Sequence, residues 1–356
     1  MTKFAAGILA LLLAYFLLWP VPVAPQSWRA PQSPPLEGVL RENTALQNVS
    51  FFSLGDARGP EDIAIGADGY LYTGVEDGRI LKINPDSGAM ETIAQLDGRP
   101  LGLEFAADGG LLIADAYHGL LRLDVKTGRV EILATQAVDG SDILYADDLD
   151  SADGVIYMSD ASTKFDPKAD GTLSASLMEI WEQGRTGRVL AYMPGGSAEI
   201  FATGLSFANG VAMAQNAILV IETGRYRIWR YYIAGPRAGE KEIWADNLPG
   251  FPDNINPDAA GGYFIGLPSP RSPAIDGLAD KPLLRKILYR IPGFQALARP
   301  EPYSFLLRLS PEGEILQSWQ DPQGGFHDVT GAVRGADGRI FVSSLTENRI
   351  AVIAGP

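Results

Sequence analysis

From about residue 50 onward, short apolar strands alternate with glycine-containing turns, and this pattern occurs six times. Each unit combines a tight turn, an alternating strand, a polar turn and usually a second strand. Turns at Gly69, Gly109 and Gly154 lie about 40 to 45 residues apart, a spacing that suits four-stranded blades. The units are found at residues 67–83, 107–123, 152–165, 215–231, 260–269 and 336–353. The pattern predicts an all-β, six-bladed β-propeller over residues 48–356; the alternative, a large β-sandwich, does not repeat at this period.

Two helical insertions, near 166–185 and 268–303, interrupt the repeat. The first has apolar residues at helical spacing, including Leu173 and Leu177. The second has two expected sides, an apolar one with Leu283, Leu284, Ile287, Leu288 and Ile291 and a polar one with Lys281, Arg285, Lys286 and Arg290. Such a basic amphipathic helix either lies on a membrane or packs on its own domain.

The first 24 residues predict a single N-terminal transmembrane or signal-anchor helix. Residues 4–19 carry no charge, and as a helix they would cover about 24 Å, slightly less than the ~30 Å hydrocarbon core. Lys3 would keep the N-terminus cytoplasmic, so the chain would be single-pass with an extracytoplasmic propeller. A cleaved signal peptide is the alternative, although Pro25 follows the best cleavage site at Ala24.

Residues 25–47 predict a proline-rich linker. Six prolines fall within residues 20–35, and such a segment favours extended polyproline geometry. We therefore expect a stalk that could hold the propeller about 50 Å from the membrane.

Charge and cysteine content exclude several classes of function. A net charge of −14 argues against a nucleic-acid partner, because phosphates would be repelled. The absence of cysteine excludes disulfides, thiolate nucleophiles and cysteine-bound metal centres.

Oxygen-bearing side chains recur at one register, seven or eight residues before the turn of each unit. Glu61, Asp147, Asn209 and Asp253 occupy it in four units, whereas Leu101 and Thr330 occupy it in the other two. The innermost strands of a propeller line its central channel, so equivalent positions should converge near the axis. We name these positions the register.

A metal ion would explain this convergence. Several carboxylates cannot share a small volume uncompensated, and no lysine or arginine occupies the register. All-oxygen ligands, with Asn254 beside Asp253, favour one Ca²⁺ ion at the axis. The alternative is that these residues cap backbone groups at strand ends.

Several stretches resemble a known superfamily. "GPEDIAI", "FANGVAM" and "FPDNI" resemble the calcium-dependent propeller lactonases: paraoxonase, gluconolactonase and senescence marker protein. "YADDLDSADGVIYMSDASTKF" and "LPGFPDNI" resemble the strictosidine synthase-like branch. The resemblance implies calcium ligands at Glu61, Asp147, Asn209, Asp253 and Asn254, with Asp147 standing where an asparagine is usual.

Two departures limit the resemblance. Strictosidine synthase uses a glutamate in its last blade, but residues 329–333, "VTGAV", contain no carboxylate, so alkaloid condensation is not expected. Paraoxonase has a histidine where Leu101 precedes Gly102 here. His118 and His327 lie outside the register and are expected to be loop or packing residues.

Together these features predict an exported calcium-dependent hydrolase of a small-molecule lactone or aryl ester. Asp253 or Asp148 would take a proton from the attacking water. No Gly-x-Ser-x-Gly motif supports a serine mechanism. The competing hypothesis is a non-catalytic scaffold with a structural calcium, and the oligomeric state stays open.

Overall fold

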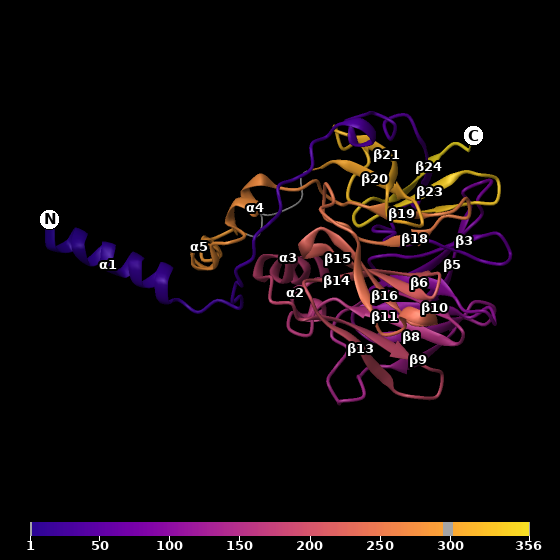
Figure 1. Cartoon of the computed structure of the whole chain (residues 1–356), viewed down its shortest axis with the longest axis horizontal. Coiled ribbons are helices and arrows are strands. Elements are labelled where there is room, and N and C mark those ends of the chain that lie inside the picture. The colour runs from indigo at the N-terminus through magenta and orange to yellow at the C-terminus, as the bar shows by residue number, and fades with distance from the viewer. Residues whose placement is uncertain (1, 295–301, 356) are drawn as a thin grey trace.

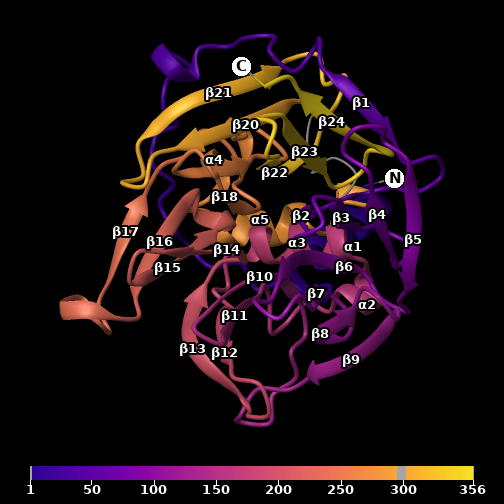
Figure 2. The ribbon, with the colours of Figure 1, turned by 90° about the vertical axis from the view of Figure 1, so that its right-hand side faces the viewer.

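The computed structural model describes residues 2–294 and 302–355, so Met1 of the predicted anchor and residues 295–301 of the second insertion lie outside it. Within the described residues, 24 strands form six four-stranded sheets. Figure 2 shows the sheets arranged as a ring, with the first strand of each blade innermost. The predicted six-bladed propeller is confirmed.

In five blades the four strands follow one another along the chain, and in the sixth the outer strand is β1. The blades comprise β2 (Ala64–Ile65), β3 (Leu71–Gly74), β4 (Arg79–Ile83) and β5 (Met90–Gln95); β6 (Pro100–Phe105), β7 (Leu111–Asp115), β8 (Gly119–Asp124) and β9 (Arg129–Ala134); β10 (Ala146–Ala152), β11 (Val155–Asp160), β12 (Gly187–Tyr192) and β13 (Ala198–Leu205); β14 (Ala208–Ala214), β15 (Ala217–Glu222), β16 (Arg227–Tyr232) and β17 (Lys241–Ala245); β18 (Ile255–Pro257), β19 (Tyr263–Gly266), β20 (Ser304–Leu309) and β21 (Ile315–Asp321); β22 (Val329–Arg334), β23 (Ile340–Ser344), β24 (Arg349–Ile353) and β1 (Ser50–Ser53).

The ring is closed by its two ends. β1 comes from the N-terminal side of the chain, yet it is the outer strand of the last blade, where Phe51 pairs with Ala351 of β24. The hydrophobic core lies between neighbouring blades. A strand inside a blade, such as β15, is therefore buried on both faces, whereas the outer strand β9 contains no buried residue. The repeated turn needs glycine, since Gly69 and Gly109 have φ of 80° and 86°.

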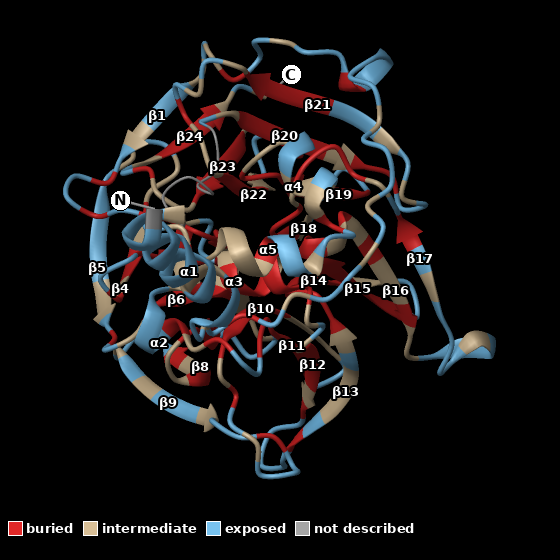
Figure 3. Ribbon diagram, turned by 90° about the vertical axis from the view of Figure 1, so that its left-hand side faces the viewer, coloured by how far each residue is buried: buried red, intermediate tan, exposed pale blue. Residues whose placement is uncertain are grey.

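Four helices form a cap on one face of the ring (Figure 3). They lie within the two predicted insertions and comprise α2 (Pro167–Asp170), α3 (Thr172–Glu182), α4 (Pro273–Leu278) and α5 (Pro282–Leu288). The indole nitrogen of Trp181 in α3 donates to the carbonyl of Arg285 in α5 at 3.1 Å, which joins the two insertions. Three single-turn 3-10 helices lie elsewhere: η1 (Gly38–Leu40), η2 (Thr223–Arg225) and η3 (Gly235–Arg237).

The predicted sides of α5 are wrong in part. Arg285 and Arg290, expected on the polar side, are 2% and 5% exposed, whereas Leu283 and Leu284 are 66% and 40% exposed. The arginines turn inward because backbone carbonyls there accept their hydrogen bonds.

The predicted stalk is also wrong, because the linker lies against the propeller and its cap. Its backbone bonds to α3 through Gln26 N and Glu182 O at 2.7 Å, and the Asn247 side chain donates to Gln32 O at 2.9 Å. Trp28 packs on Tyr226 with ring centroids 6.1 Å apart. Proline has no backbone N–H group and so does not join a sheet, but its carbonyl can still accept a hydrogen bond. A polar surface can therefore bind a proline-rich segment.

The N-terminal helix α1 (Thr2–Leu18) has 17 residues and projects from the cap face (Figure 1). Among the described residues, no helix is long and apolar enough to cross a membrane. A helix forms where the sequence predicts one, but the predicted membrane-spanning anchor is not supported.

Candidate metal centre

β-bulges present the register side chains in the third and fourth blades. The pairing of β10 with β11 shifts between Ala146 and Leu149, and that of β14 with β15 shifts between Ala208 and Val211. A bulge leaves residues out of the ladder and can re-aim their side chains. Asp147 and Asn209 are the first residues of these bulges.

Backbone contacts join the register positions of neighbouring blades. Gly210 N donates to Asp253 O at 3.0 Å, and Asn254 N donates to Thr330 O at 2.9 Å. Thr330 Oγ1 donates to Glu61 O at 2.5 Å, which continues the chain of contacts into the first blade. A Cβ atom at Gly210 would lie 2.7 Å from Asp253 O, so only glycine permits this approach.

All five predicted metal ligands are buried, at no more than 7% exposure. Asn209 Nδ2 donates to Asp253 Oδ1 at 2.5 Å, and Asn254 Nδ2 donates to Glu61 Oε1 at 3.0 Å. The structure therefore pairs Asn209 with Asp253 and Asn254 with Glu61. Asp147 lies near enough for its charge to act on Glu61 and for the charge of Asp253 to act on it.

Four side-chain oxygens of this group are buried and accept no hydrogen bond. They are Glu61 Oε2, Asn209 Oδ1, Asp253 Oδ2 and Asn254 Oδ1. An unsatisfied buried acceptor costs about 1–3 kcal/mol, so four acceptors together require an explanation. A hard cation that prefers oxygen ligands fits this donor set.

The carboxylates also disturb one another's protonation. Burial, followed by the charges of Asp253 and Asp147, raises the pKa of Glu61 well above its usual range. Burial and then Asp253 do the same to the pKa of Asp147. Burial raises the pKa of Asp253 to about 7, against the opposing effect of the hydrogen bond from Asn209. Without a counter-charge, ionisation of all three carboxyl groups at once is unfavourable.

One cation near this group was missed by the sequence analysis. Arg99 is 4% exposed, and its charge lowers the pKa of Glu61 and Asp147 against the larger effect of burial. It directly precedes β6, two residues before Leu101, and strand alternation does not extend to it, so the repeat alone could not have placed it near the register. One guanidinium cannot balance three carboxylates.

The carboxylates alone do not make a metal site. In the part of the chain that the structure describes, no three carboxylate, imidazole or thiol side chains stand close enough together to hold an ion. Any site here therefore depends on the amide oxygens of Asn209 and Asn254. The ligand set remains a prediction.

Asp148, the second predicted base, has both oxygens occupied. Its Oδ2 accepts from Val211 N of the next blade at 2.7 Å, and its Oδ1 accepts from Leu149 N at 2.8 Å. Asp62 and Asn256 accept in the same way from Leu103 and Ala332. We call Asp62, Asp148 and Asn256 the inter-blade acceptors. Their hydrogen bonds favour a structural role for Asp148 and leave Asp253 as the better candidate base.

The two histidines have local partners. His118 Nδ1 lies 3.1 Å from Asp115 Oδ1, and His327 Nδ1 lies 3.1 Å from Glu347 Oε1. These contacts agree with the expectation that both are loop or packing residues.

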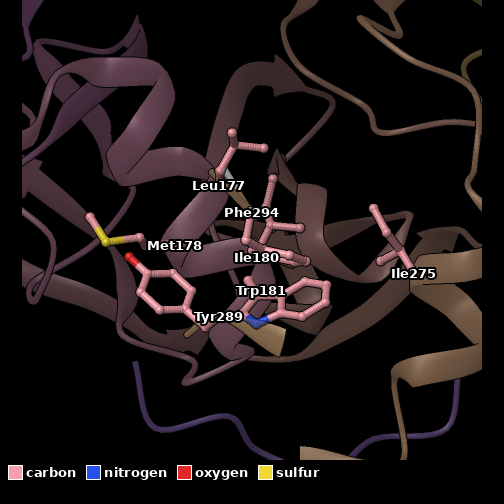
Figure 4. Close-up of a pocket in the computed structure, with 7 residues that line it drawn as sticks. All are labelled: Leu177, Met178, Ile180, Trp181, Ile275, Tyr289 and Phe294. Carbon is pink, nitrogen blue, oxygen red and sulfur yellow. The ribbon is translucent and has the colours of Figure 1, made fainter. Parts of the chain in front are cut away.

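The cap covers the face of the ring near the register. The hydroxyl of Tyr145, two residues before Asp147, lies 2.8 Å from Ser176 Oγ in α3. Tyr145 and Leu101 share one apolar cluster with Met178 and Trp181 of the cap. A small hollow (Figure 4) of about 20 Å³ lies within the cap, lined by Leu177, Met178, Ile180, Trp181, Ile275, Tyr289 and Phe294. Its lining is apolar and contains none of the register residues.

Family models match two parts of the chain. The model described as "Strictosidine synthase-like, N-terminal" matches residues 38–83, and "Strictosidine synthase" matches residues 146–236.

Similar proteins span nearly the whole chain. Human adipocyte plasma membrane-associated protein is 31% identical over 96% of this chain and 86% of its own length. Protein strictosidine synthase-like 13 of Arabidopsis thaliana is 31% identical over 87% of this chain and 78% of its own.

Solved structures share the fold at low sequence identity. A gluconolactonase from Xanthomonas campestris has a TM-score of 0.61 at 16% identity, covering 95% of this chain and 99% of its own. Regucalcin from Agrobacterium tumefaciens, described as a calcium-binding protein, has a TM-score of 0.59 at 13% identity, covering 86% and 94%. The alignments over most of both chains show that this protein belongs to the strictosidine synthase-like family, together with the adipocyte plasma membrane-associated proteins.

Proposed function

We propose that this protein is a membrane-associated, calcium-dependent hydrolase of lactones or aryl esters. The observation that carries the proposal is the set of four buried, unpaired oxygens from Glu61, Asn209, Asp253 and Asn254. Likeness to a gluconolactonase and to a calcium-binding protein supports the same interpretation at the level of fold.

Glu61, Asp147, Asn209, Asp253 and Asn254 would hold the ion. Bound Ca²⁺ would supply Lewis-acid polarisation of the substrate carbonyl and stabilise negative charge on its oxygen.

Asp253 is the proposed general base. The amide of Asn209 fixes Asp253 Oδ1, so Oδ2, which would also face the ion, is the oxygen left to accept a proton from the attacking water. Burial raises the pKa of Asp253 to about 7 in the metal-free chain, and a bound cation would lower it. Asn209 thus acts as a positioning residue as well as a proposed ligand.

The apolar lining of the cap favours a substrate with an apolar part. Its hollow is lined by aromatic and aliphatic side chains, the kind of surface that an apolar group of a substrate prefers. We propose that the apolar part of the ester or lactone binds on this side of the ring.

Hydrolysis of a lactone and aryl-ester panel by the purified full chain, with added calcium and with chelator, tests the function. We expect turnover only with calcium, and loss of at least a hundredfold in kcat for Asp253→Asn. Glu104→Gln is the matched control, because Glu104 lies on the inner strand β6 and its pKa, raised to about 8 chiefly by burial, leaves it largely neutral at pH 7. Equal rates in calcium and in chelator would refute the calcium dependence.

A calcium-stabilised scaffold is the second candidate. The observation that favours it is the engagement of both Asp148 oxygens in backbone hydrogen bonds, which leaves Asp253 as the one remaining candidate among the two predicted bases. A calcium-loaded protein that is inactive on the whole panel, yet melts at lower temperature after chelation, would establish this candidate instead.

We also propose membrane association through α1, supported by its uncharged sequence from Phe4 to Leu18 and by similarity to the human adipocyte plasma membrane-associated protein. The orientation, with a cytoplasmic N-terminus and an extracytoplasmic propeller, remains a prediction. Protease added to intact cells should cleave the propeller, and cleavage only after lysis would refute that orientation.

A further inference from the structure

Helix α5 exposes leucines where an ordinary surface helix would expose charge. Leu283 and Leu284 are 66% and 40% exposed, whereas Arg285 and Arg290 are almost fully buried. Exposed aliphatic side chains beside buried guanidinium groups invert the usual arrangement of a soluble protein. The inversion indicates that something other than water contacts this side of the cap.

The buried arginines join the cap to the N-terminal segment. Arg290 donates to the carbonyls of Trp19 at 2.7 Å and Phe16 at 3.0 Å, and the Tyr15 hydroxyl donates to Arg290 O at 2.7 Å. Arg285 donates to the carbonyls of Gln26 and Trp181. The end of α1 is therefore fixed beside α5, and Figure 1 shows the two helices on the same side of the ring.

Helix α1 is apolar around its whole circumference. At 100° per residue, its exposed side chains fall on every side of the helix, and they comprise Phe4, Ile8, Leu9, Leu11, Leu12, Leu13, Leu17 and Leu18. A protein partner would cover one side of such a helix, whereas lipid contacts all sides at once. Lipid is therefore the occupant that matches this surface.

We propose that α5 docks on the same lipid surface that receives α1, with Leu283 and Leu284 inserted at its boundary. The cap face then lies against the membrane, and the propeller does not stand away from it. The charge of Lys281, before α5, is offset by Asp280 at 3.1 Å, so the proposed contact rests on the exposed leucines. The inference rests on the proposed membrane association of α1, but it adds a second point of contact that α1 alone does not require.

Single-cysteine labelling tests the contact, because the native chain contains no cysteine. Leu283→Cys, labelled with an environment-sensitive fluorophore, is placed in phosphatidylcholine nanodiscs with the full chain intact. Ile132→Cys is the matched control, an aliphatic residue 59% exposed on the outer strand β9. Brominated acyl chains should quench the label at 283 by at least twofold and leave the label at 132 unchanged.

The outcomes separate the two proposals. A chain that does not enter nanodiscs at all refutes both the membrane association and the docking of α5. A chain that enters them while the label at 283 stays in water refutes only the docking. A label at 283 that shifts to the blue without bromine quenching identifies a protein partner, such as a second copy, and also overturns the lipid contact.

Discussion

Replacing Asp253 by asparagine should stabilise the calcium-free protein. Burial raises the pKa of Asp253 from 3.8 to about 7. The folded chain therefore holds the proton more tightly than the unfolded chain, so the free energy of unfolding falls as the pH rises from about 4 to about 7. A shift of about three pKa units at ~1.36 kcal/mol each corresponds to about 4 kcal/mol at pH 8.

Asparagine removes this charge and keeps an oxygen to accept from Asn209 Nδ2. In chelator at pH 8 we expect Asp253→Asn to gain up to about 4 kcal/mol over wild type. With an unfolding entropy of about 2.1 cal/mol/K for each of roughly 310 residues, that gain corresponds to about 6 °C in Tm. At pH 5 wild-type Asp253 is largely protonated when folded, so the gain should fall to roughly 1.6 kcal/mol.

Calcium should reduce the lead of the variant at pH 8 from about 4 to about 1.3 kcal/mol. At a calcium concentration a hundredfold above Kd, wild type gains about 2.7 kcal/mol by mass action, whereas the variant loses a charged ligand and gains far less. Calorimetric melting at pH 5 and pH 8, in chelator and in calcium, measures all four conditions. A variant that is less stable than wild type in chelator at pH 8 would refute the reasoning, because burial of the Asp253 charge would then carry no cost.

Three further variants test, in turn, a proposed metal ligand, an inter-blade hydrogen bond and the contact between the cap and the linker. Asn209→Ala removes both a proposed ligand oxygen and the donor to Asp253, so calcium affinity measured by titration calorimetry should fall at least tenfold; unchanged affinity would exclude Asn209 as a ligand. Asp148→Asn leaves one of its two backbone donors unpaired and should cost about 1–3 kcal/mol in denaturant unfolding, with calcium affinity retained; a large loss of affinity would make Asp148 part of the metal site. Arg285→Leu removes the donors to the carbonyls of Gln26 and Trp181, so trypsin should cut faster after Arg29; an unchanged cleavage rate would mean that other contacts hold the linker.

The sequence predicts the propeller because its signals are local. Each blade carries its own turn glycine and its own alternation, and six copies of a weak pattern make one strong pattern. The register follows from the same repetition, since the structure buries Glu61, Asp147, Asn209 and Asp253 on equivalent inner segments.

The linker and α5 could not be predicted because their contacts are distant in sequence. Helical spacing shows that α5 has two sides but does not show which side faces inward. That choice depends on carbonyls of Phe16, Trp19 and Gln26, which lie more than 250 residues away along the chain. Hydrogen bonds to these carbonyls offset the cost of burying Arg285 and Arg290.

The ring holds like charges in place largely with backbone contacts, because Arg99 balances only part of their charge. Glu61 and Asp147, two proposed ligands, are each followed directly by an inter-blade acceptor, Asp62 or Asp148, whose carboxylate accepts a backbone N–H of the next blade. Repulsion between the ligands would spread the blades apart, and these acceptors resist that movement. The proposed site would therefore be partly arranged before an ion arrives, at the expense of stability in the metal-free chain, and its ligands would need less rearrangement on binding. Calcium should accordingly raise the melting temperature of the whole ring and not that of one blade.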